Sequence, residues 1–90
     1  MKRFCQIYRS SRKEEMYLYV DKANGLKDVP EVLMTQFGEA QEVMTIYLGA
    51  DRKLARVNAA EVLAGIEAQG FFLQMPPTMA ELLKRDGSAD

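Results

Sequence analysis

Residues 3–20 read RFCQIYRSSRKEEMYLYV, and this stretch decides the fold. Its two ends, residues 3–8 and 16–20, are rich in aromatic and β-favouring side chains, which are typical of strands. The polar segment between them, residues 9–15, has a length that suits a connection between antiparallel strands. The sequence therefore predicts a β-hairpin with a mobile tip at the start of the chain.

The two predicted strands carry large side chains on both faces. Successive side chains of a strand point to opposite faces of its sheet. The predicted faces are Cys5 and Ile7 against Phe4 and Tyr8, and Met16, Leu18 and Val20 against Tyr17 and Tyr19. Because none of these faces is polar, we expect both sides of the sheet to be at least partly covered.

Three later stretches each start with a short polar residue three positions before a glutamate, a pattern typical of a helix capping box. The pairs are Asp28/Glu31, Asn58/Glu61 and Thr78/Glu81. Helices are predicted over about residues 29–36, 59–69 and 79–85. Each is followed by a glycine that can take the left-handed conformation of a helix end: Gly38, Gly70 and Gly87.

The apolar residues of the first two helices define the sides expected to face the sheet. These are Val29, Val32, Leu33 and Phe37 in the first helix, and Val62, Leu63 and Ile66 in the second. The alanines Ala60, Ala64 and Ala68 recur at every fourth position of the second helix. Small side chains at this spacing would permit close packing, so we expect this helix to approach the sheet through them.

Two further strands are predicted at residues 41–48 and 71–75. The later part of residues 41–48 is apolar on both faces, as expected for a central strand covered above and below. Residues 52–57 fit a short strand, a helical turn or a loop. The element order is therefore ββαβαβα, which predicts an α/β fold. We expect a three-layer α/β/α sandwich around a mixed four-stranded sheet.

Length and composition favour one small domain. We expect a single domain over residues 1–86, followed by a flexible tail over residues 87–90. No apolar run approaches the about 20 residues of a membrane-spanning helix, and no apolar signal-peptide core follows the basic start. The single cysteine, Cys5, excludes an internal disulfide framework. A cytoplasmic location and no membrane partner are expected.

Three segments together resemble the YcgL family of small bacterial proteins. They are FCQIYRSS at residues 4–11 followed by MYLYV at 16–20, DRKL at 51–54, and QGFFLQMPP at 69–77 leading into LLK at 82–84. The likeness covers roughly residues 3–84 and depends on the order and spacing of the segments rather than on one motif. It implies an α/β/α sandwich, in agreement with the pattern of elements, and carries no established biochemical activity.

The residue types that catalysis needs are scarce. The chain has no histidine, which removes the commonest general base near neutral pH and the commonest transition-metal ligand. Cys5 lies on an apolar strand face and is interpreted as a core residue, and most carboxylates are explained as cap or turn residues. The six glycines form neither a GxGxxG nor a P-loop pattern. We therefore expect no enzyme activity, no metal and no cofactor.

Charge is unevenly placed along the chain. Residues 1–20 carry a net charge of +3, and residues 21–90 carry −4. A basic hairpin on an acidic body could attract an anionic partner, whereas the alternative is that solvated turns simply carry charge.

Two hypotheses for function follow. The favoured one is a non-catalytic accessory module that binds a protein partner through an adaptable apolar surface, to which Met75 and Met79 contribute. The alternative is an RNA- or nucleotide-associated binding protein that uses the basic hairpin. Its candidate binding residues are Arg9, Arg12 and Lys13, extended by Arg52, Lys53 and Arg56, beside the tyrosines Tyr8, Tyr17 and Tyr19.

Overall fold

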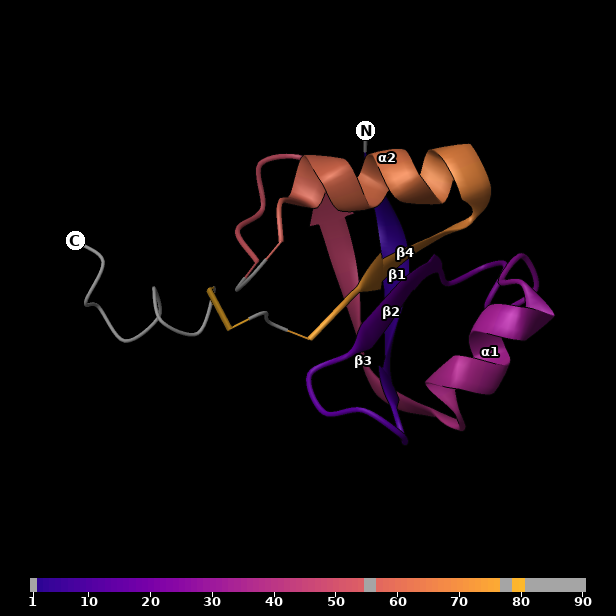
Figure 1. The fold of residues 1–90 in the computed structure, drawn as a ribbon. Helices are drawn as coiled ribbons and strands as arrows, with labels where there is room; N and C mark the ends of the chain where they lie inside the picture. Colours follow the sequence, from indigo (N-terminus) through magenta and orange to yellow (C-terminus); the bar gives the residue numbers. More distant parts are fainter. Residues whose placement is uncertain (1, 55–56, 77–78, 81–90) are drawn as a thin grey trace.

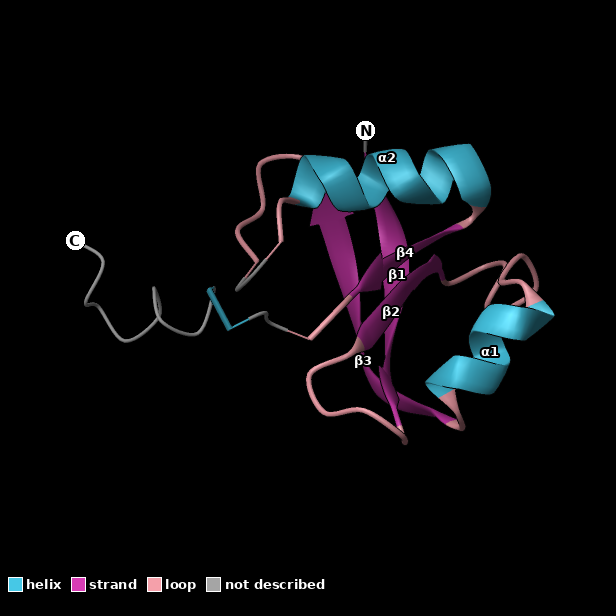
Figure 2. Cartoon of the chain, viewed as in Figure 1, coloured by secondary structure: helices cyan, strands magenta, loops and turns pink. Residues whose placement is uncertain are grey.

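The computed structural model describes residues 2–54, 57–76 and 79–80 (Figure 1). The named elements follow one another as ββαβαβ (Figure 2). Their bounds are β1 Lys2–Ser10, β2 Tyr17–Asp21, α1 Glu31–Phe37, β3 Ala40–Gly49, α2 Ala59–Gln69 and β4 Phe71–Gln74. The bounds predicted for the second helix match α2 at both ends. Of the third predicted helix, only Met79 and Ala80 are described, both helical; its remainder and the predicted tail lie outside the described residues.

The four strands form one sheet in the order β3-β1-β2-β4, and every neighbouring pair is antiparallel. β2 and β3 run in the same direction, but β1 lies between them, so no hydrogen-bonded pair of described strands is parallel. The predicted mixed sheet is therefore wrong. β3 is also an edge strand and not the predicted central strand, because it adds to the free edge of the β1–β2 hairpin.

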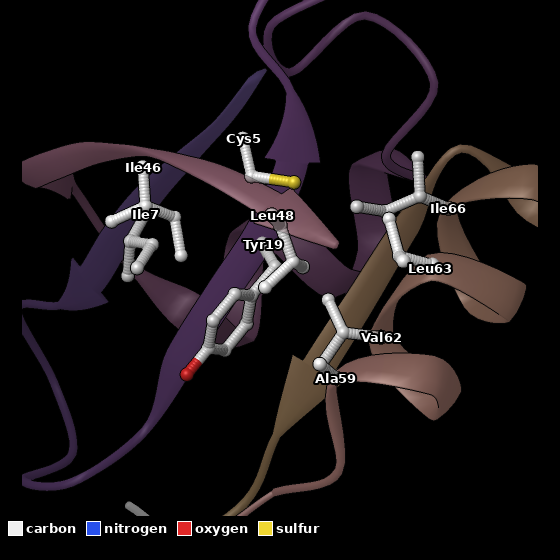
Figure 3. Packing of buried hydrophobic residues seen from close by; sticks show 9 residues of the cluster. All are labelled: Cys5, Ile7, Tyr19, Ile46, Leu48, Ala59, Val62, Leu63 and Ile66. Atoms are coloured by element: carbon white, nitrogen blue, oxygen red, sulfur yellow. The ribbon is translucent and has the colours of Figure 1, made fainter. Parts of the chain in front are cut away.

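One face of the sheet is covered by α2, which lies across the strands in Figure 1. Side chains from β1, β2 and β3 meet the inner side of this helix in the larger core cluster (Figure 3). Its buried members are Cys5, Ile7, Tyr19, Ile46, Leu48, Ala59, Val62, Leu63 and Ile66. The predicted apolar side of the second helix is thus confirmed. Each large aliphatic side chain buried here contributes roughly 1.5–3 kcal/mol, so this cluster is a main source of stability.

The alanines of α2 do not make the predicted close approach. Ala60, Ala64 and Ala68 are exposed on the outer side of the helix. The approach occurs at Gly65, where a Cβ atom would lie 3.1 Å from Cδ1 of Phe72 and 3.2 Å from the carbonyl oxygen of Phe71. The absent side chain at Gly65 therefore lets α2 lie directly against β4.

The opposite face of the sheet is covered by α1 over β2 and β4. Phe37 of α1 is fully buried in a second cluster with Leu18 and Val20 of β2, and Met34 packs against it. The prediction that Val32 faces the sheet is wrong, because this side chain is 74% exposed. Met34, and not Val32, packs against the cluster from this helix.

The described helices leave the same face open over β1 and β3. Phe4 of β1 is 58% exposed and Tyr47 of β3 is 52% exposed. The described helices therefore cover one face of the sheet along α2 and only part of the other. The complete three-layer sandwich predicted from the sequence is not formed by the described residues.

The two described helices begin in different ways. The side chain of Asn58 accepts hydrogen bonds from the backbone N–H groups of Ala60 and Glu61, and Gly70 ends α2 in the left-handed conformation, so both predictions are confirmed. α1 has Pro30 at its N-cap and no side-chain cap bond among the described residues. The Asp28/Glu31 capping box is therefore wrong, since Pro30 displaces Asp28 from the cap position. The pair Thr78/Glu81 lies outside the described residues.

This difference predicts unequal effects of two similar substitutions. Asn58→Ala should lower the free energy of unfolding by about 1 kcal/mol, because two N–H groups lose their acceptor. Asp28→Ala should lower it by less than about 0.5 kcal/mol, because no cap bond is lost. Urea unfolding followed by circular dichroism measures both. Equal losses would contradict the assignment of the caps.

Candidate functional site

The tip of the β1–β2 hairpin is fastened to the end of α1. The buried hydroxyl of Ser10 accepts hydrogen bonds from the N–H groups of Arg12 and Lys13, each at 3.0 Å, and donates to the carbonyl oxygen of Phe37. The hydroxyl of Ser11 accepts a 2.7 Å hydrogen bond from the N–H group of Glu39. Two neighbouring serines thus join the tip to the chain that leaves α1.

The hairpin tip encloses a hollow of about 490 Å³. Three predicted binding residues, Arg9, Arg12 and Lys13, line it together. The Nε atom of Arg9 donates a 2.9 Å hydrogen bond to Oε1 of Gln41 on β3, which fixes the guanidinium at the rim. The other lining residues are Ser10, Ser11, Glu14, Glu15, Tyr17 and Gln41. Because two carboxylates share the hollow with three cations, its positive charge is partly offset.

The predicted extension of this site lies at the other end of the sheet. Lys2, at the start of β1, pairs with Gly49, whereas Ser10 at its end pairs with Ala40. Arg52 and Lys53 follow Gly49 in a turn, in which the N–H group of Arg52 donates to the carbonyl oxygen of Gly49. Eight strand steps of about 3.3 Å separate the two ends by roughly 26 Å. Arg52 and Lys53 therefore do not join the hairpin cations in one site, and Arg56 is outside the described residues.

Arg3, the other arginine of the hairpin, has a structural position. Its Nη1 atom lies 2.8 Å from Oδ2 of Asp21, and its Nη2 atom lies 3.2 Å from Oε2 of Glu67. These ion pairs join β1, the end of β2 and α2. Arg3 is therefore engaged within the protein and does not belong to the hairpin hollow.

The tyrosines predicted as a stacking platform are largely covered. Tyr19 is buried and donates a 2.9 Å hydrogen bond to Oε1 of Gln74, and Tyr8 and Tyr17 are half-buried. Burial raises the pKa of Tyr8, and the negative charge of Glu42 raises it further. These rings act mainly as packing residues.

A different pair of rings is exposed. Phe4 and Tyr47 face each other from β1 and β3, with ring centroids 4.8 Å apart and planes inclined at 47°. Beside them, Oγ1 of Thr45 donates to Oε1 of Gln6, whose Nε2 atom donates to the carbonyl oxygen of Met44. We call the exposed side chains of Phe4, Thr45 and Tyr47 the open face, and the buried Gln6 lies beside them. The open face was not predicted from the sequence, because the apolar pattern of residues 41–48 is typical of a covered central strand.

Cys5 is a core residue, as predicted. Its side chain is fully buried under α2 (Figure 3). Burial raises the pKa of its thiol to about 11, although the nearby positive charge of Arg3 acts in the opposite direction. A neutral, inaccessible thiol is a poor nucleophile. In the described part of the chain, no three histidine, cysteine or acidic side chains come together as they would around a metal ion.

Comparison with known proteins identifies the family. A family model of the YcgL domain matches residues 5–77. A YcgL domain-containing protein of Chromohalobacter salexigens is 52% identical over 82 residues, which cover 91% of this chain and 85% of that protein. One of Pseudomonas aeruginosa strain PAO1 is 52% identical over 84 residues, covering 93% and 87%, and one of Hahella chejuensis is 46% identical over 82 residues, covering 91% and 77%. The chain belongs to the YcgL domain family, as the resemblance indicated.

These names describe a domain and assign no activity. None of the helices in the described ranges has the length and apolar character needed to cross a bilayer. The hairpin hollow and the open face beside β3 are the surfaces that have features of a binding site.

The buried thiol predicts a pH dependence of stability. The thiol ionises near pH 9 in the unfolded chain and near pH 11 in the folded protein. Because the folded pKa is raised, the contribution of Cys5 is fully present below pH 9 and is lost as the pH rises from 9 to 11. The free energy of unfolding of the native chain should therefore fall more steeply over this range than that of Cys5→Ala. The free energies of unfolding are measured by urea titration at pH 8, 9 and 10. The same decrease with pH in the native chain and in Cys5→Ala would contradict this prediction.

Proposed function

We propose that this YcgL domain is a non-catalytic accessory module that binds a protein partner along β3. The partner contributes an extended segment, which adds to the sheet as a fifth strand. The observation that carries the proposal is the combination of a strand edge that no described strand pairs with and exposed large apolar side chains on the same strand.

The edge supplies the backbone groups. β3 has ten residues and pairs with β1 on one side, and no described strand pairs with its other side. An edge strand presents free N–H and C=O groups that a second chain can pair with. Natural proteins often protect long edges with charged side chains or proline, but Glu42 is the single charged residue of β3. A register shift at Val43, between the pairs Ile7–Met44 and Tyr8–Glu42, interrupts the ladder near the hairpin end, so the edge is least protected over residues 45–49.

The side chains of β3 supply apolar contact area. Val43, Met44 and Tyr47 are between 44% and 52% exposed. Tyr47 shares the open face with Phe4 of β1, whereas Met44 pairs with Ile7 and lies on the α2 side of the sheet, so a strand added at this edge would meet apolar side chains on both faces. An aromatic pair on a sheet surface offers a large, rigid contact area, and such residues are enriched at the centres of interfaces. The open face thus lies beside the edge that would receive the partner strand.

Charge indicates which segment fits. The one charge of β3, Glu42, lies near the hairpin end of the strand, opposite Tyr8. The ring pair lies towards the other end of β3, where Phe4 pairs with Tyr47. The best-matched partner is an extended segment with apolar residues beside the ring pair and one cation facing Glu42.

The open face predicts which substitutions disrupt binding. The double variant Phe4→Ala/Tyr47→Ala should reduce partner retention at least about tenfold, because it removes both rings from the centre of the surface. The control is Val32→Ala, which truncates an even more exposed apolar residue on α1. Retention is measured by quantitative mass spectrometry after tagged capture from nuclease-treated lysate.

Hydrogen exchange then decides whether the partner adds as a strand. Addition of the captured partner should slow amide exchange along β3 while leaving α1 unchanged. A partner that is lost equally from the ring variant and from Val32→Ala, or that leaves β3 exchange unaltered, would contradict the proposal.

A second candidate function is RNA or nucleotide binding at the hairpin hollow. It is favoured by one observation, namely that Arg9, Arg12 and Lys13 converge on a single hollow. Contacts to phosphates release counterions, so binding of this kind weakens steeply with salt. Binding of an apolar protein segment at β3 has no comparable salt dependence.

The salt dependence gives a quantitative expectation. With three phosphate contacts, affinity for a single-stranded oligoribonucleotide should fall roughly twentyfold between 50 and 200 mM salt. Arg9→Ala/Arg12→Ala/Lys13→Ala should abolish retention at both salt concentrations. The control Lys22→Ala/Lys27→Ala/Lys53→Ala removes the same charge outside the hollow and should leave retention within about twofold of the native value. Similar effects of the two triple variants would reject the hairpin as the site.

A further inference from the structure

We infer that the hairpin hollow is a binding site for a phosphate group, and that Gly38 positions the residues that hold it. This inference rests on the second candidate function and specifies the chemistry of its site. The phosphate could belong to a small phosphorylated molecule or to an RNA backbone, and the experiment below separates these sources.

Part of the hollow is ordered before any ligand binds, namely the guanidinium of Arg9 and the backbone that carries Arg12 and Lys13. Arg9 is fixed through Nε by Gln41, which leaves its two terminal nitrogens to donate elsewhere. The backbone at Arg12 and Lys13 is fixed by the buried hydroxyl of Ser10. Ion pairs found among the described residues involve Arg3 and not these three cations. Fixing the Arg9 guanidinium and the backbone that carries the other two cations reduces the conformational entropy lost when an anion binds.

Gly38 makes room for the tip of the hairpin. A Cβ atom at this position would lie 2.5 Å from Oγ of Ser11 and 2.6 Å from Cγ of Arg12. The backbone of Gly38 has φ 80° and ψ −155°, a conformation that is essentially restricted to glycine. Ser11 and the stem of Arg12 therefore lie directly against the residue that ends α1. Any side chain there would displace both.

The donor set matches a multiply charged oxyanion. Two guanidinium groups and one ammonium group can donate to several oxygens at once, and guanidinium geometry suits phosphate. Glu14 and Glu15 line the same hollow, so a singly charged ligand gains little there. A phosphate group with more than one negative charge is attracted strongly enough to overcome these carboxylates. Their presence also predicts that removing their charge strengthens binding.

The test is a titration of the ¹⁵N-labelled protein with two probes, inorganic pyrophosphate and a ten-residue oligouridylate. Both should shift the amide signals of Ser11, Arg12 and Lys13 saturably at 50 mM salt if any phosphate group suffices. Shifts with the oligouridylate alone identify the RNA backbone as the source. Shifts with pyrophosphate alone support the phosphate site and reject the nucleic-acid function. No saturable shift with either probe overturns the inference, as does oligouridylate binding that leaves these amides unshifted.

Variants test the roles assigned to single residues. Arg12→Ala should weaken binding of the active probe at least about fivefold, and Glu14→Gln/Glu15→Gln should strengthen it at least about twofold. Gly38→Ala should weaken binding to a similar extent as Arg12→Ala. Its control is Gly25→Ala, which also has positive φ but meets no atom within 4 Å. Native affinity in Gly38→Ala overturns the role of Gly38, and if that variant does not fold, Arg12→Ala and the glutamate variant still decide the site.

Discussion

The position of β1 in the centre of the sheet is the constraint on which the rest of the structure depends. Its nine residues pair with β2 on one side and with β3 on the other. Alternation along β1 then sends Cys5 and Ile7 under α2, while Phe4 and Tyr8 go to the opposite face. Because α1 covers β2 and β4, the part of β1 next to β3 has a covered side and an open side. The open face follows from this arrangement.

Local signals in the sequence predicted local structure well. The bounds of α2 could be predicted at both ends because its start and stop are set by Asn58 and Gly70, which act on their immediate neighbours. The faces of β1 and β2 were predicted correctly for the same reason, since alternation is a local property. The prediction failed at α1 because Asp28 and Glu31 have capping-box spacing, but the proline between them occupies the cap position.

Pairing between distant strands could not be predicted in the same way. An apolar run such as residues 43–48 is compatible with a central strand and with an edge strand whose apolar side chains are exposed. A central strand and an edge strand differ only in whether a strand pairs on both sides. The pairing strands come from distant parts of the sequence, so local patterns do not reveal them. The same limit affected the candidate site: Arg9, Arg12 and Lys13 are close in sequence and line one hollow, whereas Arg52 and Lys53 were added by charge alone. The length of β1 places them at the other end of the sheet.

Gly38 links the fold to the hollow. It ends α1 with a hydrogen bond from its N–H group to the carbonyl oxygen of Met34, and β3 begins two residues later at Ala40. The preceding residue, Phe37, is fully buried and also accepts the hydrogen bond from Ser10. The burial of Phe37 therefore fixes the end of α1 against the sheet, and the fixed end of α1 in turn holds the hairpin tip. Phe37, Gly38 and Glu39 thus connect the core to the hairpin tip, because each of them contacts a residue of the tip. A shift of α1 would therefore alter the hollow. The open face lies at the far end of β3 and would keep its geometry.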